Sequence, residues 1–532
     1  MEKKNILLDS SDFVKIIEND NIYVDKTQTL QRLVSDQYGS RFFIARPRRF
    51  GKSLMLSTLK TIFRGQRELF DGLAISSTDY AWPIFPVVHL DMSSVLADDL
   101  SELKRNIVNM IRLQSREHGV SVDFSVYDTP SSSLGAFLYE MSRVHTKGVV
   151  ILIDEYDAPV NRLVEKGADS SAVSSLLHDF YMQFKVYDSA IRFLMMTGVS
   201  KFAKLSVFSG LNNLKDLTLE PEYAGLLGYT QEEISHYFKD HIAAFAEANG
   251  TTYEEAFSLL LDWYDGYRFS PYSDVRVTNP VSLASALEKK RFDPFWNETG
   301  YSLLIYKHLK NRRIIPAQLN GFVADKADLN YCNLEDRHSP ALLFQTGYLT
   351  IDEILPDGKL KFKIPNREVL QAMTSGMLAF IFKDETTPLV DRLKSARTRL
   401  QRDPENLEEI LRETLTAAFH AIPYDWSVKD EPEARRMFLF YCNLMGADIR
   451  GEVHSSLGRA DAELLFEDSV FVFEFKYGKT AQEALEQAEE KGYAGPYLNG
   501  TRTIYLVGVN YNPEKRNIDP PMCRIYRAKK HG

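Results

Sequence analysis

The chain has 532 residues, of which 44% are hydrophobic and 26% are charged. This is the composition of folded globular proteins, so disordered and fibrous classes are excluded. Lys and Arg total 64 against 73 Asp and Glu, which leaves a formal net charge of -9. A protein that coats nucleic acid through its overall charge is therefore excluded, and any contact with nucleic acid requires a local basic patch.

The length predicts three or four domains, at roughly 100–200 residues per domain. The three cysteines, Cys332, Cys442 and Cys523, are far apart in the chain. Their spacing excludes a disulfide scaffold and a zinc finger and fits a reducing compartment. The sequence has neither the apolar run of a signal peptide nor about 18 consecutive apolar residues. We therefore expect a cytoplasmic protein without a membrane partner.

Short apolar runs alternate with helical stretches over the first two-fifths of the chain. The predicted strands are residues 41–45, 86–90, 148–153 and 191–196. Nearly continuous apolar strands separated by helices are typical of a parallel sheet that helices cover on both faces. Residues 219–310 are mostly helical, and a helix at 230–249 is predicted to end at Gly250.

The second half of the chain shows two further patterns. An apolar helix at 339–349 precedes strands 349–354 and 360–364, which flank an Asp357-Gly358 turn. A helix followed by such a hairpin predicts a winged helix. After a charged helical stretch at 389–421, interrupted at Pro404, the pattern becomes rich in strands. These strands are predicted at 460–466, 470–477 and 503–509, with a helix at 480–491.

The first predicted strand leads directly into a candidate phosphate-binding loop. The segment Arg46-Pro-Arg-Arg-Phe-Gly-Lys-Ser fits G-x-x-x-x-G-K-[ST] except at its first position, and a helix at 54–63 follows. A strand–turn–helix of this kind holds phosphates with backbone N–H groups and the helix dipole. Lys52 would reach the β- and γ-phosphates, and the Ser53 hydroxyl would hold Mg²⁺. The alternative is a surface turn that happens to contain these residues.

A second element strengthens this interpretation. The strand VVILIDEYD at 149–157 ends in carboxylates, of which Asp154 would hold the metal and Glu155 would polarise the attacking water. A third strand ends at Thr197, where a γ-phosphate sensor is expected. Strands ending in acidic residues also occur by chance, but the combination predicts an ATPase that uses ATP and Mg²⁺. The predicted nucleotide-binding residues are Arg46, Pro47, Arg48, Arg49, Phe50, Gly51, Lys52, Ser53, Asp154 and Thr197.

Five segments together resemble the bacterial AAA-ATPase-like family, which is similar to archaeal-type and STAND-like signalling ATPases. They are Tyr23-Val-Asp-Lys-Thr, Arg46-Pro-Arg-Arg-Phe-Gly-Lys-Ser, Ile153-Asp-Glu-Tyr-Asp, Trp263-Tyr-Asp-Gly-Tyr-Arg-Phe and Pro365-Asn-Arg-Glu-Val. The resemblance spans about residues 1–375 and implies a helical lid and a winged helix after the core. It also places residues 23–27 near the nucleotide base, with a packing strand as the alternative. Arg46 is what this family shows at its position, yet glycine takes backbone angles there that arginine takes only with strain.

The C-terminal strands carry a carboxylate cluster. Alternate residues of a strand share a face, so Glu474 and Lys476 point one way and Phe471, Phe473 and Phe475 point the other. If strands 460–466 and 470–477 pair as a hairpin, Asp461 and Glu474 converge on one divalent cation. Lys476 then lies near the attacking water or the scissile phosphate. The alternative is ordinary cross-strand charge pairing on a solvated face.

This D…ExK…Q order resembles the PD-(D/E)xK nuclease superfamily over about residues 425–532. The resemblance implies metal ligands Asp461 and Glu474, a catalytic Lys476 and a supporting Gln487. It also implies an assisting glutamate on an upstream helix, for which Glu433 matches best. Mg²⁺ is the expected cation at this site, with Mn²⁺ as an alternative. Ala460 precedes Asp461 where the usual motif has proline.

The expected fold class is α/β multidomain: a parallel-sheet P-loop core, a helical lid, a winged helix and an α/β PD-(D/E)xK domain. The predicted boundaries are 1–218 for the core, 219–300 for the lid, 301–375 for the winged helix, 376–424 for a helical linker and 425–532 for the nuclease domain. Basic clusters at 289–291, 312–313 and 392–402 are either phosphate contacts or solvated helix faces.

Three hypotheses follow for the function. In the first, an ATPase switch controls a metal-dependent nuclease that cleaves nucleic acid, with DNA favoured over RNA. In the second, the nuclease fold is inactive and only binds nucleic acid or a partner in a nucleotide-dependent way. In the third, the nuclease is active and the P-loop is a slow nucleotide holder. Oligomerisation is left open, and so is any arginine finger.

Overall fold

The computed structural model divides into two compact units, Met1–Trp296 with Gly321–Arg367 and Asn297–Asn320 with Glu368–Gly532. The residues described are 4–8, 10–35, 39–201, 213–296, 305–306, 309, 314, 316–329, 340–382, 386–403, 406–420, 422, 428–444, 448–455, 458–466, 469–498 and 502–526. Within this part of the chain, no helix is both long and apolar enough to cross a membrane. The five predicted domain boundaries stay predictions.

The first unit is built on a five-stranded sheet in the order β2-β3-β4-β1-β5, in which all pairs are parallel. Its strands are β1 (Arg41–Ala45), β2 (Val87–Asp91), β3 (Val149–Asp154), β4 (Ile191–Gly198) and β5 (Lys215–Asp216). The four predicted strands are confirmed within two residues at each end. Because β4 lies between β1 and β3, the carboxyl ends of the three strands that carry candidate nucleotide-site residues are neighbours.

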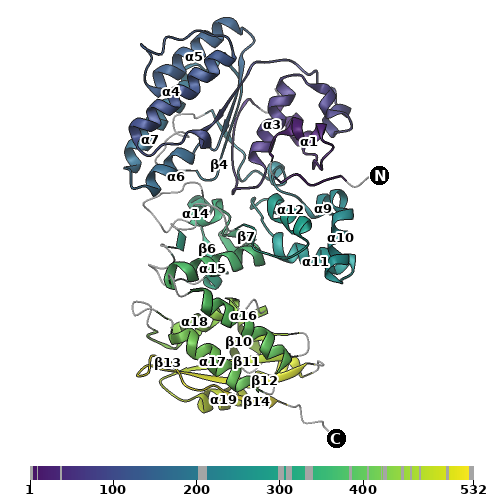
Figure 1. Ribbon diagram of the computed structural model, residues 1–532, viewed down its shortest axis with the longest axis vertical. Coiled ribbons are helices and arrows are strands. Elements are labelled where there is room, and N and C mark those ends of the chain that lie inside the picture. Colours follow the sequence, from purple (N-terminus) through teal and green to yellow (C-terminus); the bar gives the residue numbers. More distant parts are fainter. Residues whose placement is uncertain are drawn as a thin grey trace. The chain divides into compact units, whose positions relative to one another are not determined.

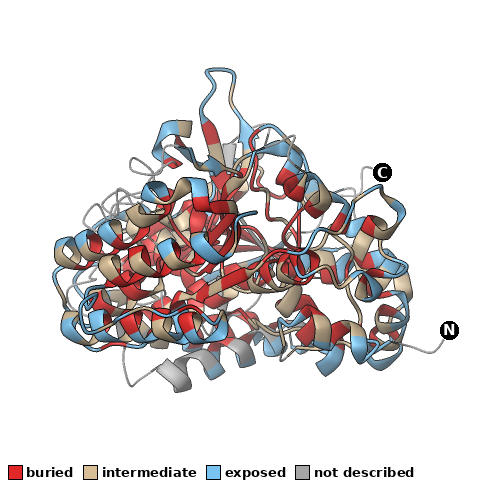
Figure 2. Ribbon diagram, turned by 90° about the horizontal axis from the view of Figure 1, so that it is seen from above, coloured by how far each residue is buried: buried red, intermediate tan, exposed pale blue. Residues whose placement is uncertain are grey.

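Helices cover both faces of this sheet (Figure 1). The helix α3 (Lys52–Phe63) lies on one face, and α4, α5, α6 and α7 lie on the other. The latter span Leu100–Glu117, Pro130–Val144, Ala158–Glu165 and Ser170–Val186. Two short helices, α1 (Phe13–Glu18) and α2 (Thr27–Val34), precede the sheet. All six residues of β3 are buried, and in Figure 2 the helices are red on the sides that pack inward and pale blue outside. This burial accounts for the continuous apolar runs in the sequence.

A helical lid follows, formed by α9 (Gln231–Tyr237), α10 (Lys239–Asn249), α11 (Tyr253–Tyr264) and α12 (Pro280–Lys289). The single helix predicted at 230–249 is wrong, because the chain breaks at Phe238, whose buried ring joins the lid core. The expected cap at Gly250 is confirmed, with a left-handed φ of 66°.

The last part of the first unit is a small winged-helix arrangement. A three-stranded sheet in the order β6-β8-β7 consists of Phe322–Ala324, Leu360–Lys363 and Thr350–Ile354. Its helix, α14 (Pro340–Gln345), is shorter than predicted because the chain turns at Gly347, and Ser339 lies outside the described residues. The hairpin turn at Asp357-Gly358 is confirmed. The next helix, α15 (Arg367–Phe382), belongs to the second unit from Glu368 onward.

The second unit contains a mixed sheet in the order β13-β12-β11-β10-β9, with β14 paired to β12. Its strands are β9 (Asp448–Ser455), β10 (Gly458–Leu465), β11 (Ser469–Tyr477), β12 (Thr503–Asn512), β13 (Asn517–Ile518) and β14 (Met522–Tyr526). The predicted hairpin is confirmed, since β10 and β11 are antiparallel. The predicted helix is α19 (Ala481–Glu490), which connects β11 to its parallel neighbour β12. The sequence patterns missed β9, β13 and β14.

This unit also contains α16 (Thr386–Arg402), α17 (Leu407–His420) and α18 (Glu431–Leu444). The first two form the predicted charged helical stretch, and Pro404 between them lies outside the described residues. The fold class is therefore confirmed as α/β multidomain, with a parallel-sheet core, a lid and a winged helix followed by a mixed α/β domain.

Candidate nucleotide and nuclease sites

The phosphate loop turns tightly between β1 and α3. Two residues of the turn are left-handed, Arg49 with φ 68° and Gly51 with φ 93°. The Lys52 Nζ donates to the backbone oxygens of Arg46 (2.9 Å) and Pro47 (3.0 Å), so the loop curls around its own lysine. Burial lowers the pKa of Lys52, and Glu155 and Asp154 oppose that shift. Arg46 does not have a positive φ, so the loop closes without strain at that position, and Arg49 is the arginine that takes left-handed backbone angles.

The side chain of Arg46 has a structural set of partners. Its Nη1 donates to the oxygens of Thr218 (2.7 Å) and Ala45 (2.9 Å), and its Nη2 donates to the oxygen of Tyr223 (3.4 Å). The guanidinium carbon lies 4.3 Å from the centre of the Phe269 ring. Burial lowers the pKa of Arg46 to about 9. This arginine anchors the start of the loop, which a glycine at the same position would not do.

A cavity of about 390 Å³ opens beside the loop. The predicted residues Arg49, Phe50, Gly51, Lys52 and Ser53 line it together with Glu155. Its apolar walls come from residues 6–8 and 22–24, from 226–229 and from α12. A pocket that is polar at a helix N-terminus and has several apolar side chains elsewhere matches the phosphates and the base of a nucleotide. The other predicted residues, Arg46, Pro47, Arg48, Asp154 and Thr197, lie outside this wall.

The acidic strand and the sensor strand are joined by a short hydrogen bond. The Thr197 hydroxyl donates to Asp154 Oδ1 at 2.6 Å, and the Glu155 N–H donates to the same oxygen at 3.0 Å. Glu155 is left-handed, with φ 47°, and follows directly on β3. Burial raises the pKa of Glu155, and the Lys52 ammonium opposes the shift. A carboxylate with a raised pKa suits a group that accepts a proton.

Asp157 is a residue of this region that the sequence analysis missed. Its carboxylate accepts hydrogen bonds from the N–H groups of Val199 and Ser200 and from the Ser200 hydroxyl, at 2.9–3.3 Å. It therefore ties the end of the acidic strand to the segment after Thr197. Its place three residues after Asp154, in a sequence with two other acidic residues, was the available signal.

Residues 23–27 do not form the packing strand considered as an alternative. Asp25 accepts hydrogen bonds from the Thr27 N–H (2.8 Å) and hydroxyl (2.7 Å) at the start of α2. The Lys26 Nζ lies 2.5 Å from Glu233 of the lid and donates to the Gly225 oxygen. Tyr23, Val24 and Lys26 line the cavity. The expected place near the base stays a prediction that this position supports.

The segment Trp263–Phe269 supports the loop from the lid side. The rings of Tyr267 and Phe269 meet Phe50 of the loop edge to face, at 4.9 and 5.3 Å. Gly266, with φ 112°, is required because a Cβ there would lie 2.3 Å from the Pro365 oxygen. The backbone at Gly266 therefore packs directly against the Pro365 segment.

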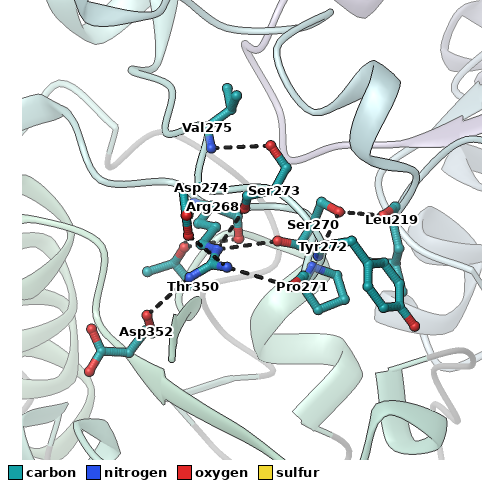
Figure 3. Close-up of polar contacts among 10 residues, drawn as sticks. All are labelled: Leu219, Arg268, Ser270, Pro271, Tyr272, Ser273, Asp274, Val275, Thr350 and Asp352. Atoms are coloured by element: carbon teal, nitrogen blue, oxygen red, sulfur yellow. Dashed lines mark hydrogen bonds and ion pairs between the residues drawn. The ribbon is translucent and has the colours of Figure 1, made fainter. Parts of the chain in front are cut away.

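Arg268 of the same segment fixes an adjacent loop (Figure 3). Its Nε donates to the Ser273 oxygen at 2.8 Å, and its Nη2 pairs with Asp274 at 3.0 Å. Its backbone N–H donates to the Thr350 hydroxyl of β7 at 2.7 Å. The arginine thus joins the lid to the winged helix within the first unit.

The winged helix also contacts the nucleotide elements. Gln345 accepts a hydrogen bond from the Lys201 N–H at 2.8 Å, just after the sensor strand. At Gly347, which has φ 88°, a Cβ would lie 2.9 Å from the Pro47 ring of the loop. Through these contacts the winged helix packs against the nucleotide core.

The carboxylate cluster of the second unit assembles as the hairpin predicts. Ala462 pairs with Phe473, which places Asp461 opposite Glu474. Asp461 accepts a hydrogen bond from the Phe475 N–H at 2.8 Å. Glu474 Oε1 accepts from Lys476 Nζ (3.0 Å) and from Gln487 Nε2 (2.5 Å). Four predicted residues, from two strands and α19, therefore meet at one place.

Glu474 is the residue of this cluster whose pKa is shifted most clearly. Burial, and then the neighbouring Asp461, raises the pKa of Glu474 to about 7. Its second oxygen, Oε2, is buried without a hydrogen-bond partner. A buried carboxylate oxygen without a donor is costly unless a cation or a proton meets it. The donor set therefore fits a divalent cation held by Asp461 and Glu474.

The upstream helix α18 carries the predicted Glu433 and a second glutamate, Glu431, that contacts the cluster. Glu433 accepts a hydrogen bond from the Lys429 N–H at 2.9 Å and so caps its own helix. Glu431 lies 3.9 Å from Lys476 Nζ, and Arg435, one turn later, lies 2.7 Å from Asp461 Oδ1. The assisting role of Glu433 stays a prediction, while Glu431 is the glutamate of α18 that pairs with the cluster. Sequence spacing missed both Glu431 and Arg435.

Among the described residues, no group of three or more His, Cys, Asp or Glu side chains is arranged to hold a metal ion. One residue in each of two basic clusters forms a local ion pair, Arg291 with Asp293 (2.8 Å) and Arg399 with Glu413 (2.9 Å). Arg312 and Arg313 lie outside the described part of the chain.

Comparison with known proteins agrees with this architecture. Residues 9–208 match the family model described as "Predicted AAA-ATPase", and residues 429–520 match the PD-(D/E)XK nuclease superfamily. A protein of Azotobacter chroococcum mcd 1, "Uncharacterized protein in vnfD 5'region", is 31% identical over 534 residues. That alignment covers 97% of this chain and 98% of the relative. The chain belongs to the AAA-ATPase-like family, with a C-terminal domain of the PD-(D/E)XK nuclease superfamily.

Proposed function

We propose that this protein is an ATP-binding and ATP-hydrolysing switch that controls a metal-dependent nuclease acting on nucleic-acid phosphodiesters. The observation that carries the proposal is the meeting of Asp461, Glu474, Lys476 and Gln487 at one end of the hairpin. The cavity beside the phosphate loop supports the nucleotide half. DNA is the substrate proposed first, with RNA as the second arm of the test.

In the nucleotide half, Lys52 exchanges its two loop carbonyls for phosphate oxygens, which a cation binds more strongly. Ser53 and Asp154 would hold Mg²⁺, which supplies positive charge against the phosphates. Thr197 keeps Asp154 in one orientation through its hydroxyl. Glu155 orients the attacking water and accepts its proton, a role that its raised pKa supports.

In the nuclease half, Asp461 and Glu474 would hold the divalent cation, which supplies charge stabilisation and a more acidic water. Gln487 fixes one oxygen of Glu474 and leaves the other directed away from the amide. Lys476, held between Glu474 and Glu431, is positioned to meet the scissile phosphate or the attacking water.

One observation favours a second candidate function, a nuclease fold that binds nucleic acid without cutting it. Both oxygens of Asp461 already have partners, Arg435 and the Phe475 N–H. With both oxygens engaged, Asp461 acts as the acidic partner of an internal ion pair with Arg435 rather than as a metal ligand. In that case the protein is a nucleotide-dependent binding switch.

The test is cleavage of a plasmid, single-stranded DNA and RNA with Mg²⁺ or Mn²⁺, each with and without ATP. The variants are Glu474→Ala and Asp461→Ala, with Glu489→Ala as the matched control, because Glu489 pairs with the exposed Arg524 on the same domain. We expect cleavage by the wild type and the control and at least about a 100-fold loss in the two site variants. Binding without cleavage in every condition supports the second candidate.

The Lys52→Ala variant tests whether nucleotide binding governs cleavage or whether the two activities merely occur in the same chain. If nucleotide governs cleavage, this variant loses ATP binding and its cleavage no longer responds to ATP. A variant that loses ATP binding while cleavage stays at the ATP-stimulated level shows that the P-loop only holds nucleotide.

A further inference from the structure

Arg435 joins the nuclease cluster from α18, although the sequence pattern of the cluster does not include it. Its Nη1 lies 2.7 Å from Asp461 Oδ1, and about a quarter of its side chain stays exposed. Glu431 lies four residues earlier on the same helix and contacts Lys476. Residues four apart share a helix face, so α18 presents an acidic and a basic group to the same cluster.

The charges around Asp461 explain why an arginine stands there. Asp461 and Glu474 are both buried and lie on neighbouring strands, so their negative charges repel. The Arg435 guanidinium offsets the charge of Asp461 while no cation is bound. A divalent cation held by the same carboxylates would make this offset unnecessary, because its two charges exceed the single charge of the arginine.

Once released from Asp461, the Arg435 guanidinium can bind another anion at this site. Its planar fork matches a phosphate, with which it forms two parallel hydrogen bonds. The partial exposure of Arg435 gives a nucleic-acid backbone access to it, whereas Lys476 is buried and held by two glutamates. Arg435 is therefore the more exposed of the two basic side chains, and an approaching nucleic-acid backbone reaches it before Lys476.

We propose that Arg435 is a phosphate-binding residue of the nuclease site that competes with the divalent cation for Asp461. Arg435 pairs with Asp461 when the cation is absent and turns to the nucleic-acid backbone when the cation is present. This inference rests on the proposed nuclease function and extends it with a residue that exchanges partners.

The test measures two affinities of the full-length protein, one for a cation and one for DNA. The first is the affinity for Mn²⁺ alone, by calorimetry without nucleic acid. The second is the affinity for a fluorescein-labelled duplex in Ca²⁺, with gels that confirm an intact probe. The variants are Arg435→Gln and Arg435→Lys. The control is Arg524→Gln, which removes an arginine from the exposed ion pair with Glu489 in the same domain.

Competition predicts changes of opposite sign. Arg435→Gln binds Mn²⁺ about 3- to 10-fold more tightly, because a positive charge no longer occupies Asp461. It binds the duplex about fivefold or more weakly, and the salt dependence of binding falls by about one charge. Arg435→Lys keeps the charge and restores both affinities to within about threefold, and Arg524→Gln leaves both unchanged.

A purely structural role predicts something else. If Arg435 only holds the site together, Arg435→Gln weakens both affinities at once, and that result overturns the proposal. Unchanged affinities with a wild type that binds both ligands overturn it as well and leave the nuclease function standing. A wild type that binds neither Mn²⁺ nor DNA overturns the proposed function and this inference together.

Discussion

At the scale of single residues, the most informative departure from a common motif is Arg46. The phosphate loop usually starts with glycine, and here an arginine takes that position without a positive φ. Its side chain donates to three backbone oxygens from two parts of the first unit. Burying a guanidinium is costly, so its hydrogen bonds and the contact with Phe269 must offset that cost.

Arg46→Gly, which restores the usual motif, should therefore destabilise this protein. We expect the free energy of unfolding to fall by about 3 kcal/mol, because carbonyl oxygens lose their donor and a void replaces the side chain. Urea unfolding followed by tryptophan fluorescence measures this, since Trp82, Trp263 and Trp296 lie in the first unit. Arg46→Lys, which keeps the charge and loses the fork, should fall between the two. A glycine variant as stable as the wild type contradicts the anchoring role.

Glu474 gives a prediction about pH. Its pKa in the folded protein is raised from 4.5 to about 7, so the folded state holds a proton that the unfolded state has released. In the metal-free protein the contribution of Glu474 to stability is fully present below about pH 4.5 and is lost as the pH rises to about 7. The slope is at most about 1.4 kcal/mol per pH unit.

Urea unfolding of wild type and Glu474→Gln in EDTA, at several pH values from 5 to 8, checks the sign. The difference in stability between the variant and the wild type should grow in favour of the variant as the pH rises. A difference that is constant across this range would show that Glu474 keeps an ordinary pKa.

At the scale of elements, the winged helix packs on the nucleotide core through the turn at Gly347. This glycine has φ 88° and faces Pro47 of the phosphate loop, while Gly358 has φ 84° and open space where a Cβ would point. The two glycines therefore share a left-handed backbone and differ in their contact with the loop. They form a matched pair for testing whether the winged helix sets the loop.

Gly347→Ala should weaken nucleotide binding by about 10-fold or more, because its methyl group pushes on Pro47 and shifts the loop carbonyls that hold Lys52. Gly358→Ala should lower the free energy of unfolding about as much as Gly347→Ala does, because both glycines have a positive φ. It should leave nucleotide affinity within about twofold of the wild type. Titration of a fluorescent ATP analogue measures both. Equal losses of affinity in the two variants would mean that the contact with the loop has no effect.

Local sequence patterns predict most of these elements. The differences from the prediction arise where side chains pack between elements. Periodicity alone indicates one continuous helix at 230–249, but packing of Phe238 into the lid core divides it. Spacing did not indicate the contact of Glu431 with Lys476, because that contact depends on the rotation of α18 about its own axis. That rotation depends on how Phe438 packs against Phe473 and Phe475, which lie more than 30 residues away.

At the scale of the whole molecule, the question is whether nucleotide state governs cleavage. Glu155→Gln keeps the shape of the side chain and removes the proton acceptor, so it should bind ATP and hydrolyse it at least about 100-fold more slowly. Cleavage by this variant with ATP should then equal cleavage by the wild type with a non-hydrolysable ATP analogue.

Glu140→Gln serves as the control, since Glu140 pairs only loosely with Arg143 on the exposed side of α5. It should behave as the wild type in both assays. If Glu155→Gln and the wild type cleave equally with and without every nucleotide, the two activities are independent and the switch is refuted.

Local sequence is enough to specify most strands and helices, the loop Arg46–Ser53 and the pairing of Asp461 with Glu474. Each of these depends on a short-range regularity: a strand–turn–helix order, or the two-residue period that places alternate side chains on one face. Three other features arise only when the elements pack against one another. They are the anchoring of the loop by Arg46, the contact of Gly347 with Pro47, and the approach of Arg435 and Glu431 to the nuclease cluster. Those contacts join residues far apart in the chain, and no local period specifies how two packed elements are rotated against each other.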